Sequence, residues 1–209
     1  YSIDYETLRR EIDWAIGHGV NGLTLAMATE VFRLTDEERS TLVVRTVEFV
    51  EGRVPVIASV GGESIVQAIR HTEAASHAGA GALMAIPPAL TRCSGEAVVE
   101  YYEAILAASD LPLVLQDASG YVGNAIPIET QGALYRRYPG RILFKPEALP
   151  FGPTISAIRS VAGEDAVIFE GTGGIALVES HARGVRGTMG GTDLCRALVV
   201  LWGALERGD

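Results

Sequence analysis

The sequence is poor in lysine, cysteine and histidine, and it has no basic cluster and no long apolar run. One lysine, two cysteines and four histidines occur among 209 residues, and the formal net charge is -9. An acidic chain without a basic patch argues against nucleic acid or an anionic membrane as a partner. Because glycine or charge interrupts every apolar run, we expect no segment to span a bilayer.

The few cysteines and histidines also exclude several kinds of site. Cys93 and Cys195 are far apart, and we expect two reduced thiols in a cytoplasmic protein rather than a disulfide. All four histidines fall in segments of helical pattern: His18, His71, His77 and His181. None of them has a metal-ligand spacing, and no Cys-x-x-Cys run occurs. We therefore expect no catalytic metal, no other cofactor and no Cys-His nucleophile pair.

The length and a hydrophobic content of 48% fit one globular domain. Short β-branched runs alternate with longer segments of helical period. Seven strands are predicted at residues 22–26, 54–60, 82–86, 113–116, 142–145, 166–170 and 187–189. Eight helices are predicted at residues 4–18, 35–51, 64–78, 95–109, 128–138, 154–161, 175–183 and 194–205. The second helix opens on a capping box, Thr35-Asp36-Glu37-Glu38.

Regular alternation of strands and helices predicts an α/β fold with a parallel sheet and helices outside it. A doubly wound open sheet and a closed barrel both fit this pattern. The nearly constant repeat of roughly 25 to 30 residues favours a (β/α)8 TIM barrel. Since the chain opens on a helix, with seven strands for eight helices, we expect a single barrel domain over residues 1–209 that lacks its first strand.

Lys145, the only lysine, ends the predicted strand 142–145. Strand alternation places Leu143 and Lys145 on one side, and if Leu143 faces the barrel interior, Lys145 does so at the C-terminal mouth, where barrels carry active sites. Arginine supplies the positive charge elsewhere in the chain, but its guanidinium stays protonated, whereas the amine of a lysine can attack a ketone. Apolar walls would lower the pKa of the amine from about 10.4 and free it to form a Schiff base. The alternative is an ordinary surface lysine at a strand end.

Several runs in matching order resemble the dihydrodipicolinate synthase/N-acetylneuraminate lyase family of class I aldolase-type barrels. They are Leu-Thr-Asp-Glu-Glu-Arg at 34–39, Gly-Arg-Val-Pro-Val-Ile-Ala at 52–58, Ala-Ile-Pro-Pro at 85–88, Leu-Pro-Leu-Val-Leu at 111–115 and Phe-Lys-Pro-Glu at 144–147. The resemblance implies that Lys145 forms the imine with a small 2-keto acid. It also implies a first strand before Tyr1, a C-terminal helical extension after Asp209, and a homo-oligomer, either a dimer or a tetramer.

The sequence departs from the usual pattern of this family at four places. The loop that holds the keto-acid carboxylate reads Gly-Thr-Thr-Gly-Glu in the family, whereas here Ala28, Thr29 and Glu30 stand in it. Gln116 replaces the proton-relaying tyrosine after the family's fifth strand, and Tyr121 replaces an arginine that meets the aldehyde co-substrate. A second relay tyrosine usually follows the Pro-Pro segment, where Ala89-Leu90 stands here. These departures argue against dihydrodipicolinate synthesis.

Three short runs look more like the L-2-keto-3-deoxyarabonate dehydratase branch: the Gln-Asp run, the Phe-Lys-x-Glu run and Thr-Met-Gly-Gly at 188–191. That resemblance implies a 2-keto-3-deoxy sugar acid as the substrate. A cationic imine at C2 acidifies the C3 proton, after which loss of the C4 hydroxyl is dehydration, whereas cleavage of C3–C4 is a retro-aldol reaction. Both outcomes stay open.

The candidate catalytic residues are therefore Lys145, Gln116 and Glu147. Gln116 is expected to hold a substrate hydroxyl or a water, because an amide does not titrate. Glu147 and Glu170 are rival candidates for the proton carrier. The candidate substrate-binding residues are Ala28, Thr29, Glu30, Gly171, Thr172 and Gly190.

Three other functions remain open. The glycine-rich run at 171–174 precedes a helix and fits a phosphate site, which would imply a phosphorylated sugar. A 4-hydroxy-tetrahydrodipicolinate synthase or an aldolase like N-acetylneuraminate lyase is a second alternative. A barrel that binds a keto acid without turnover is the third, since fold alone does not fix function.

Overall fold

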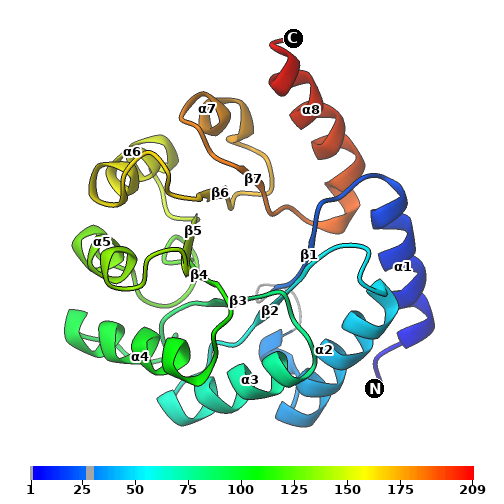
Figure 1. Ribbon diagram of the computed structural model, residues 1–209, viewed down its shortest axis with the longest axis horizontal. Coiled ribbons are helices and arrows are strands. Elements are labelled where there is room, and N and C mark those ends of the chain that lie inside the picture. The colour runs from blue at the N-terminus through cyan, green and yellow to red at the C-terminus, as the bar shows by residue number, and fades with distance from the viewer. Residues whose placement is uncertain (1, 27–30) are drawn as a thin grey trace.

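The structure, a computed structural model, describes residues 2–26 and 31–209. Within these ranges, parallel strands lie at the centre and helices surround them as an outer ring (Figure 1). The strands are β1 (Leu23–Leu25), β2 (Val56–Ser59), β3 (Ala82–Ala85), β4 (Leu113–Asp117), β5 (Ile142–Pro146), β6 (Phe169–Glu170) and β7 (Gly187–Thr188). The predicted α/β barrel class is confirmed.

The helices alternate with the strands along the chain, beginning with α1. They are α1 (Tyr5–Gly17), α2 (Asp36–Val50), α3 (Ile65–His77), α4 (Gly95–Ala108), α5 (Ile128–Arg137), α6 (Phe151–Ala162), α7 (Leu177–Ala182) and α8 (Cys195–Arg207). Short 3-10 turns occupy Val31–Arg33 and Thr192–Leu194. The predicted capping box at the start of α2 is present, because Thr35 and Glu38 each accept a hydrogen bond from the backbone of the other.

The strands pair in sequence order. A five-stranded parallel sheet runs from β1 to β5, and β6 pairs with β7 in a second parallel sheet. A parallel bridge between Phe144 and Ile168 joins the two sheets. Parallel strands bring their carboxyl ends to one rim, so residues at the ends of β4, β5, β6 and β7 share that rim.

Two predicted boundaries were wrong. The predicted helix 154–161 begins earlier, at Phe151, because Pro153 sits in the first turn of α6, where the missing N–H costs nothing. The predicted strand 166–170 is shorter: Ala166 donates its N–H to Gly163 in a turn, and β6 itself covers only Phe169–Glu170.

The ring of strands is open between its first and last members. No ladder joins β1 to β7 in the part of the chain that the structure describes. A cavity of about 400 Å³ lies in this interval, with Thr24 and Thr188 on either side. Leu198 and Trp202 of α8 line its outer part, and Figure 1 shows α8 beside α1 at this place. The predicted incomplete barrel thus has its opening between these two strands.

The main core fills the space between the strands and helices. Its largest side chains include Tyr101, Tyr102 and Phe144, all at most 1% exposed. Cys93 and Cys195 are free thiols. Over residues 2–26 and 31–209, no helix is both long enough and apolar enough to cross a membrane.

Candidate active site

Lys145 lies at the carboxyl end of β5, directly beside Gln116 of β4 in the parallel register. Phe144, the residue before it, packs against Tyr135 of α5 with ring centroids 5.7 Å apart. Because side chains alternate along a strand, Lys145 points away from the helices and toward the interior. Its side chain is buried and lines the cavity between β1 and β7. This is the orientation that the sequence pattern predicted.

Glu147 is the nearest charged partner of the lysine. Glu147 directly follows β5, and at two residues from Lys145 in extended backbone its side chain lies on the same face. The Nζ atom of Lys145 forms an ion pair with Oε1 of Glu147. The backbone N–H of Glu147 donates to the carbonyl of Asp117 at 2.8 Å, which extends the pairing of β4 and β5. The Glu147 side chain is only 3% exposed, so the carboxylate acts inside a nearly dry site.

Burial has the largest effect on the pKa of Lys145. It lowers the pKa of Lys145 to about 8, while the charge of Glu170 acts in the opposite direction. The adjacent Glu147 carboxylate also favours the ammonium form and offers an acceptor for its proton. A neutral amine, which is the nucleophilic form, is therefore accessible near neutral pH.

Gln116 connects the two strands through its side-chain amide. Its Nε2 atom donates to both oxygens of Glu147, at 3.1 and 3.2 Å. A carboxylate accepts only, so these contacts fix the amide with Oε1 on the other side. That Oε1 atom is buried and accepts no hydrogen bond from any group that the structure describes. A buried acceptor of this kind suits a donor from a ligand, such as a hydroxyl.

Tyr121 completes the surroundings of Glu147. The sequence placed it where the family has an arginine that meets the aldehyde co-substrate, but did not predict its contact with Glu147. Its hydroxyl donates to Oε2 of Glu147. Burial raises the pKa of Tyr121, and a hydrogen bond with Gln116 acts in the opposite direction. The available signal was its place, four residues after the end of β4.

Glu170 has a different environment from Glu147. Its carboxylate accepts hydrogen bonds from the N–H groups of Thr172 and Gly174, at 2.9 and 3.0 Å, and from the hydroxyls of Thr172 and Thr188. Four donors hold this carboxylate in place, and its charge reaches Lys145 only through space. Of the two rival glutamates, Glu147 is the one that forms an ion pair with the lysine.

The predicted substrate-binding residues differ in their surroundings in the structure. Gly171 packs against Glu147, where a β carbon would overlap the γ carbon of the glutamate. Thr172 directs both its N–H and its hydroxyl to Glu170, so neither is turned to a substrate. Gly190 lines the same cavity as Lys145. The predicted residues Ala28, Thr29 and Glu30 lie outside the residues that the structure describes.

The donors at this rim do not form a metal site in the part of the chain described. Across residues 2–26 and 31–209, no group of three or more histidine, cysteine or acidic side chains is arranged to hold a metal ion. The polar groups that do meet are one amine, one amide, one phenol and one carboxylate, from Lys145, Gln116, Tyr121 and Glu147. This set can bind a carbonyl compound covalently and move protons beside it.

Comparison with known proteins identifies relatives over most of the chain. The model of the dihydrodipicolinate synthetase family matches residues 2–197. The 4-hydroxy-tetrahydrodipicolinate synthase of Persephonella marina is 31% identical over 177 residues, which cover 84% of this chain and 60% of that protein. The chain thus spans about 60% of the length of this curated relative.

Solved structures share the fold. The 4-hydroxy-tetrahydrodipicolinate synthase of Methylacidiphilum fumariolicum SolV superposes with a TM-score of 0.92 at 24% identity, covering 99% of this chain and 69% of that one. The 2-keto 3-deoxygluconate aldolase of Picrophilus torridus gives a TM-score of 0.89 at 24% identity, covering 98% and 73%. At this identity the likeness shows the barrel fold alone.

Proposed function

The chain belongs to the dihydrodipicolinate synthetase family, and from that premise we propose that it is a lyase that uses Lys145 to form an imine with a 2-keto acid. One observation carries the proposal: a buried lysine amine at the C-terminal rim of a barrel, in an ion pair with a buried glutamate. Burial lowers the pKa of this amine to about 8, which makes it available as a nucleophile.

In the proposed reaction, Glu147 first takes the proton of the Lys145 ammonium. The free amine attacks the C2 ketone, and a proton moves from the nitrogen to the former ketone oxygen. Glu147 then returns its proton to this hydroxyl, so that water leaves, a cationic imine forms and Glu147 is again a carboxylate. That imine withdraws electrons, so that the C3 proton becomes acidic and Glu147 can accept it. Glu147 suits this role better than Glu170, because the carboxylate of Glu170 is occupied by four hydrogen-bond donors.

We propose a 2-keto-3-deoxy sugar acid as the substrate. The buried Oε1 atom of Gln116 supports this, since it suits a hydroxyl donor that pyruvate does not have. With the C4 hydroxyl as leaving group the reaction is a dehydration, and with C3–C4 cleavage it is an aldolase reaction. Gly190 lines the same cavity as Lys145, and we propose that it contacts the substrate on the side of β7. We propose that the loop with Ala28, Thr29 and Glu30 contacts the substrate carboxylate.

A 4-hydroxy-tetrahydrodipicolinate synthase is the second candidate, because the curated relative from Persephonella marina carries that name. Gln116 and Tyr121 argue for a different pattern of proton transfer. A phosphorylated substrate is less well supported, because the N–H groups of Thr172 and Gly174 already donate to the Glu170 carboxylate. A phosphate there would meet a negative charge rather than free donors.

Reductive trapping tests the function. Pyruvate with cyanoborohydride should add one mass of reduced pyruvate to the 209-residue chain, and peptide mapping should find it on Lys145. A screen of 2-keto-3-deoxy acids should then yield a dehydrated or cleaved product, whereas pyruvate with aspartate semialdehyde should yield little condensation. No adduct with any keto acid would refute the lysine mechanism, and an adduct without any product would identify a keto-acid-binding barrel.

We further propose that an additional strand fills the interval between β1 and β7 and completes the barrel. Phe169 of β6 and Thr188 of β7 would then be part of a closed barrel. A dimer or tetramer remains a prediction from the family resemblance, and a cytoplasmic location remains a prediction from the reduced state expected of Cys93 and Cys195.

A further inference from the structure

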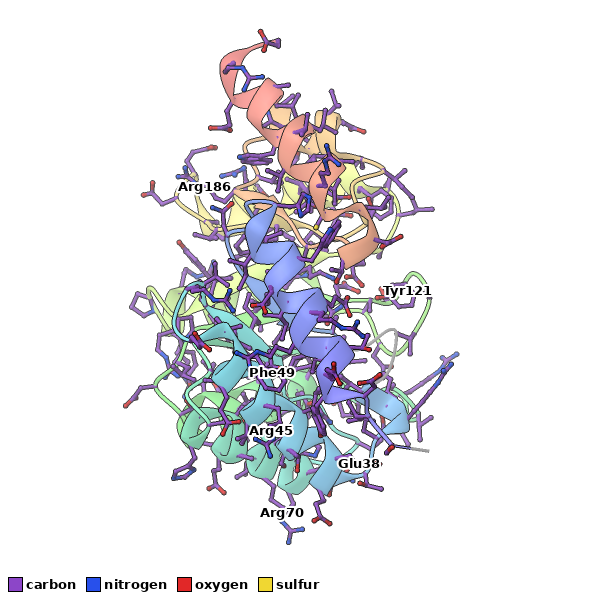
Figure 2. All side chains as sticks on the ribbon, turned by 90° about the vertical axis from the view of Figure 1, so that its right-hand side faces the viewer. Glu38, Arg45, Phe49, Arg70, Tyr121 and Arg186 are labelled. Atoms are coloured by element: carbon purple, nitrogen blue, oxygen red, sulfur yellow. The ribbon has the colours of Figure 1, made fainter. Side chains whose placement is uncertain are left out.

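Tyr121 links the interior of the site to the solvent. The residue is 56% exposed, yet its hydroxyl donates to Oε2 of Glu147, whose side chain is 3% exposed. Figure 2 shows Tyr121 and Arg186, the residue before β7, on opposite sides of the molecule. One residue that is largely exposed therefore contacts a buried carboxylate.

The loop that carries Tyr121 is held tightly against β5. Asp117, at the end of β4, accepts a hydrogen bond from the N–H of Ile126 at 3.2 Å and so closes the loop. A β carbon on Gly120 would lie 2.9 Å from the carbonyl oxygen of Glu147, so only a glycine allows this approach. The backbone on both sides of Tyr121 thus fixes its hydroxyl over the glutamate.

The other side chains that contact Glu147 are poorly suited to exchange its proton with water. The amide of Gln116 does not titrate, and the nitrogen of Lys145 is bound to the substrate once the imine has formed. The hydroxyl of Tyr121 can donate and accept at the same time. Since burial raises its pKa, the phenol keeps its proton and stays a donor to the carboxylate.

We propose that Tyr121 passes protons between Glu147 and the solvent during turnover, an inference that rests on the proposed lysine-imine function. When the C3–H bond breaks, its electron pair forms the C2–C3 double bond of the enamine and the proton joins the Glu147 carboxylate. The protonated Glu147 then gives this proton to the phenolic oxygen while the phenol releases its own proton to water. The net change is one proton moved from C3 to solvent, with Tyr121 and Glu147 restored. Tyr121 acts through Glu147 and is a positioning residue.

Exchange of pyruvate methyl protons in D2O, followed by NMR, measures this step directly, because it needs only the imine and the enamine. Tyr121→Phe should slow the exchange by about tenfold to a hundredfold, the lower part of the range for general acid–base catalysis. The amount of Lys145 trapped by cyanoborohydride should change less than twofold. Added imidazole, a small diffusible base, should restore much of the exchange in Tyr121→Phe. Tyr138→Phe, at the end of α5, is the matched control and should behave as the unaltered chain.

Each outcome decides the proposal. Slow exchange with normal trapping and imidazole rescue supports the proton path. Unchanged exchange in Tyr121→Phe, or slow exchange that imidazole does not restore, overturns it while the lysine mechanism stands. Loss of trapping in Tyr121→Phe alone would mean that the tyrosine supports the lysine site, which also overturns the path. Absence of trapping in the unaltered chain refutes the proposed function itself.

Discussion

Glu147 occupies the space in which a side chain of Gly171 would lie. A β carbon on Gly171 would overlap the γ carbon of Glu147 and would also lie 3.0 Å from the carbonyl oxygen of Pro146. The glycine that follows β6 therefore determines how the glutamate that follows β5 approaches Lys145. The two residues are 24 positions apart in the sequence, and this contact arises only when β5 and β6 lie side by side.

Gly171→Ala should displace Glu147 from the lysine. Since the added methyl group and the glutamate cannot occupy the same space, we expect turnover to fall by roughly tenfold to a hundredfold, a loss of about 1.4 to 2.8 kcal/mol of transition-state stabilisation. Steady-state kinetics of the variant would measure this loss. Gly95→Ala, at a position with no neighbouring atom within 4 Å, is the control and should keep full activity. Full activity in Gly171→Ala would show that the position of Glu147 is unimportant.

Adduct formation should depend on pH through Lys145. Its pKa is lowered by burial to about 8, so the amine is mostly protonated below pH 8 and mostly neutral above it. Because only the neutral amine attacks, the rate of trapping with pyruvate should rise about tenfold per unit well below pH 8 and level off above it. Rates measured from pH 6 to pH 10 would show this. A midpoint near the ordinary lysine value of about 10.4 would mean that burial does not control this group.

Gln116 should act by holding the substrate rather than by titrating. Gln116→Ala removes both the amide that supports Glu147 and the free Oε1 acceptor. Turnover of a 2-keto-3-deoxy acid should fall by one to three orders of magnitude, about 1.4 kcal/mol for each. Trapping of pyruvate, which has no C4 hydroxyl, should fall less than tenfold. Equal losses with both compounds would contradict a role in hydroxyl binding.

The lysine site could be predicted from the sequence because its signals are local. Lys145 is the only lysine and ends a strand, and the alternation of one β-strand gives its direction. The contact of Tyr121 with Glu147 could not be predicted in the same way. The position of the tyrosine depends on the approach of Gly120 to Glu147 and on the hydrogen bond that joins Asp117 to Ile126. Such contacts between loops leave no periodic pattern.

Thr172 shows why a glycine-rich run is a weak signal. Free N–H groups before a helix would suit a phosphate, and residues 171–174 have the composition for this. In the structure, Glu170 turns its carboxylate into the run and takes the N–H groups of Thr172 and Gly174. The sequence reveals a carboxylate at position 170, but not the direction of its side chain.

The opening between β1 and β7 can be tested without any substrate. The N–H of Leu23 donates to Pro55 at 3.0 Å, toward β2. Because consecutive residues of a parallel strand direct their backbone groups to opposite neighbours, the N–H of Thr24 faces the interval. Leu83 of β3 is a suitable reference, since its N–H donates to Pro112 at 2.8 Å.

In the 209-residue chain, the Thr24 amide should exchange with solvent deuterium at least about a hundredfold faster than the Leu83 amide, a difference of ~3 kcal/mol in the free energy of opening. Amide exchange followed by NMR would measure both rates. Equal protection at the two positions would mean that another strand already covers the edge of β1, either from this chain or from a second copy, and that the barrel is closed.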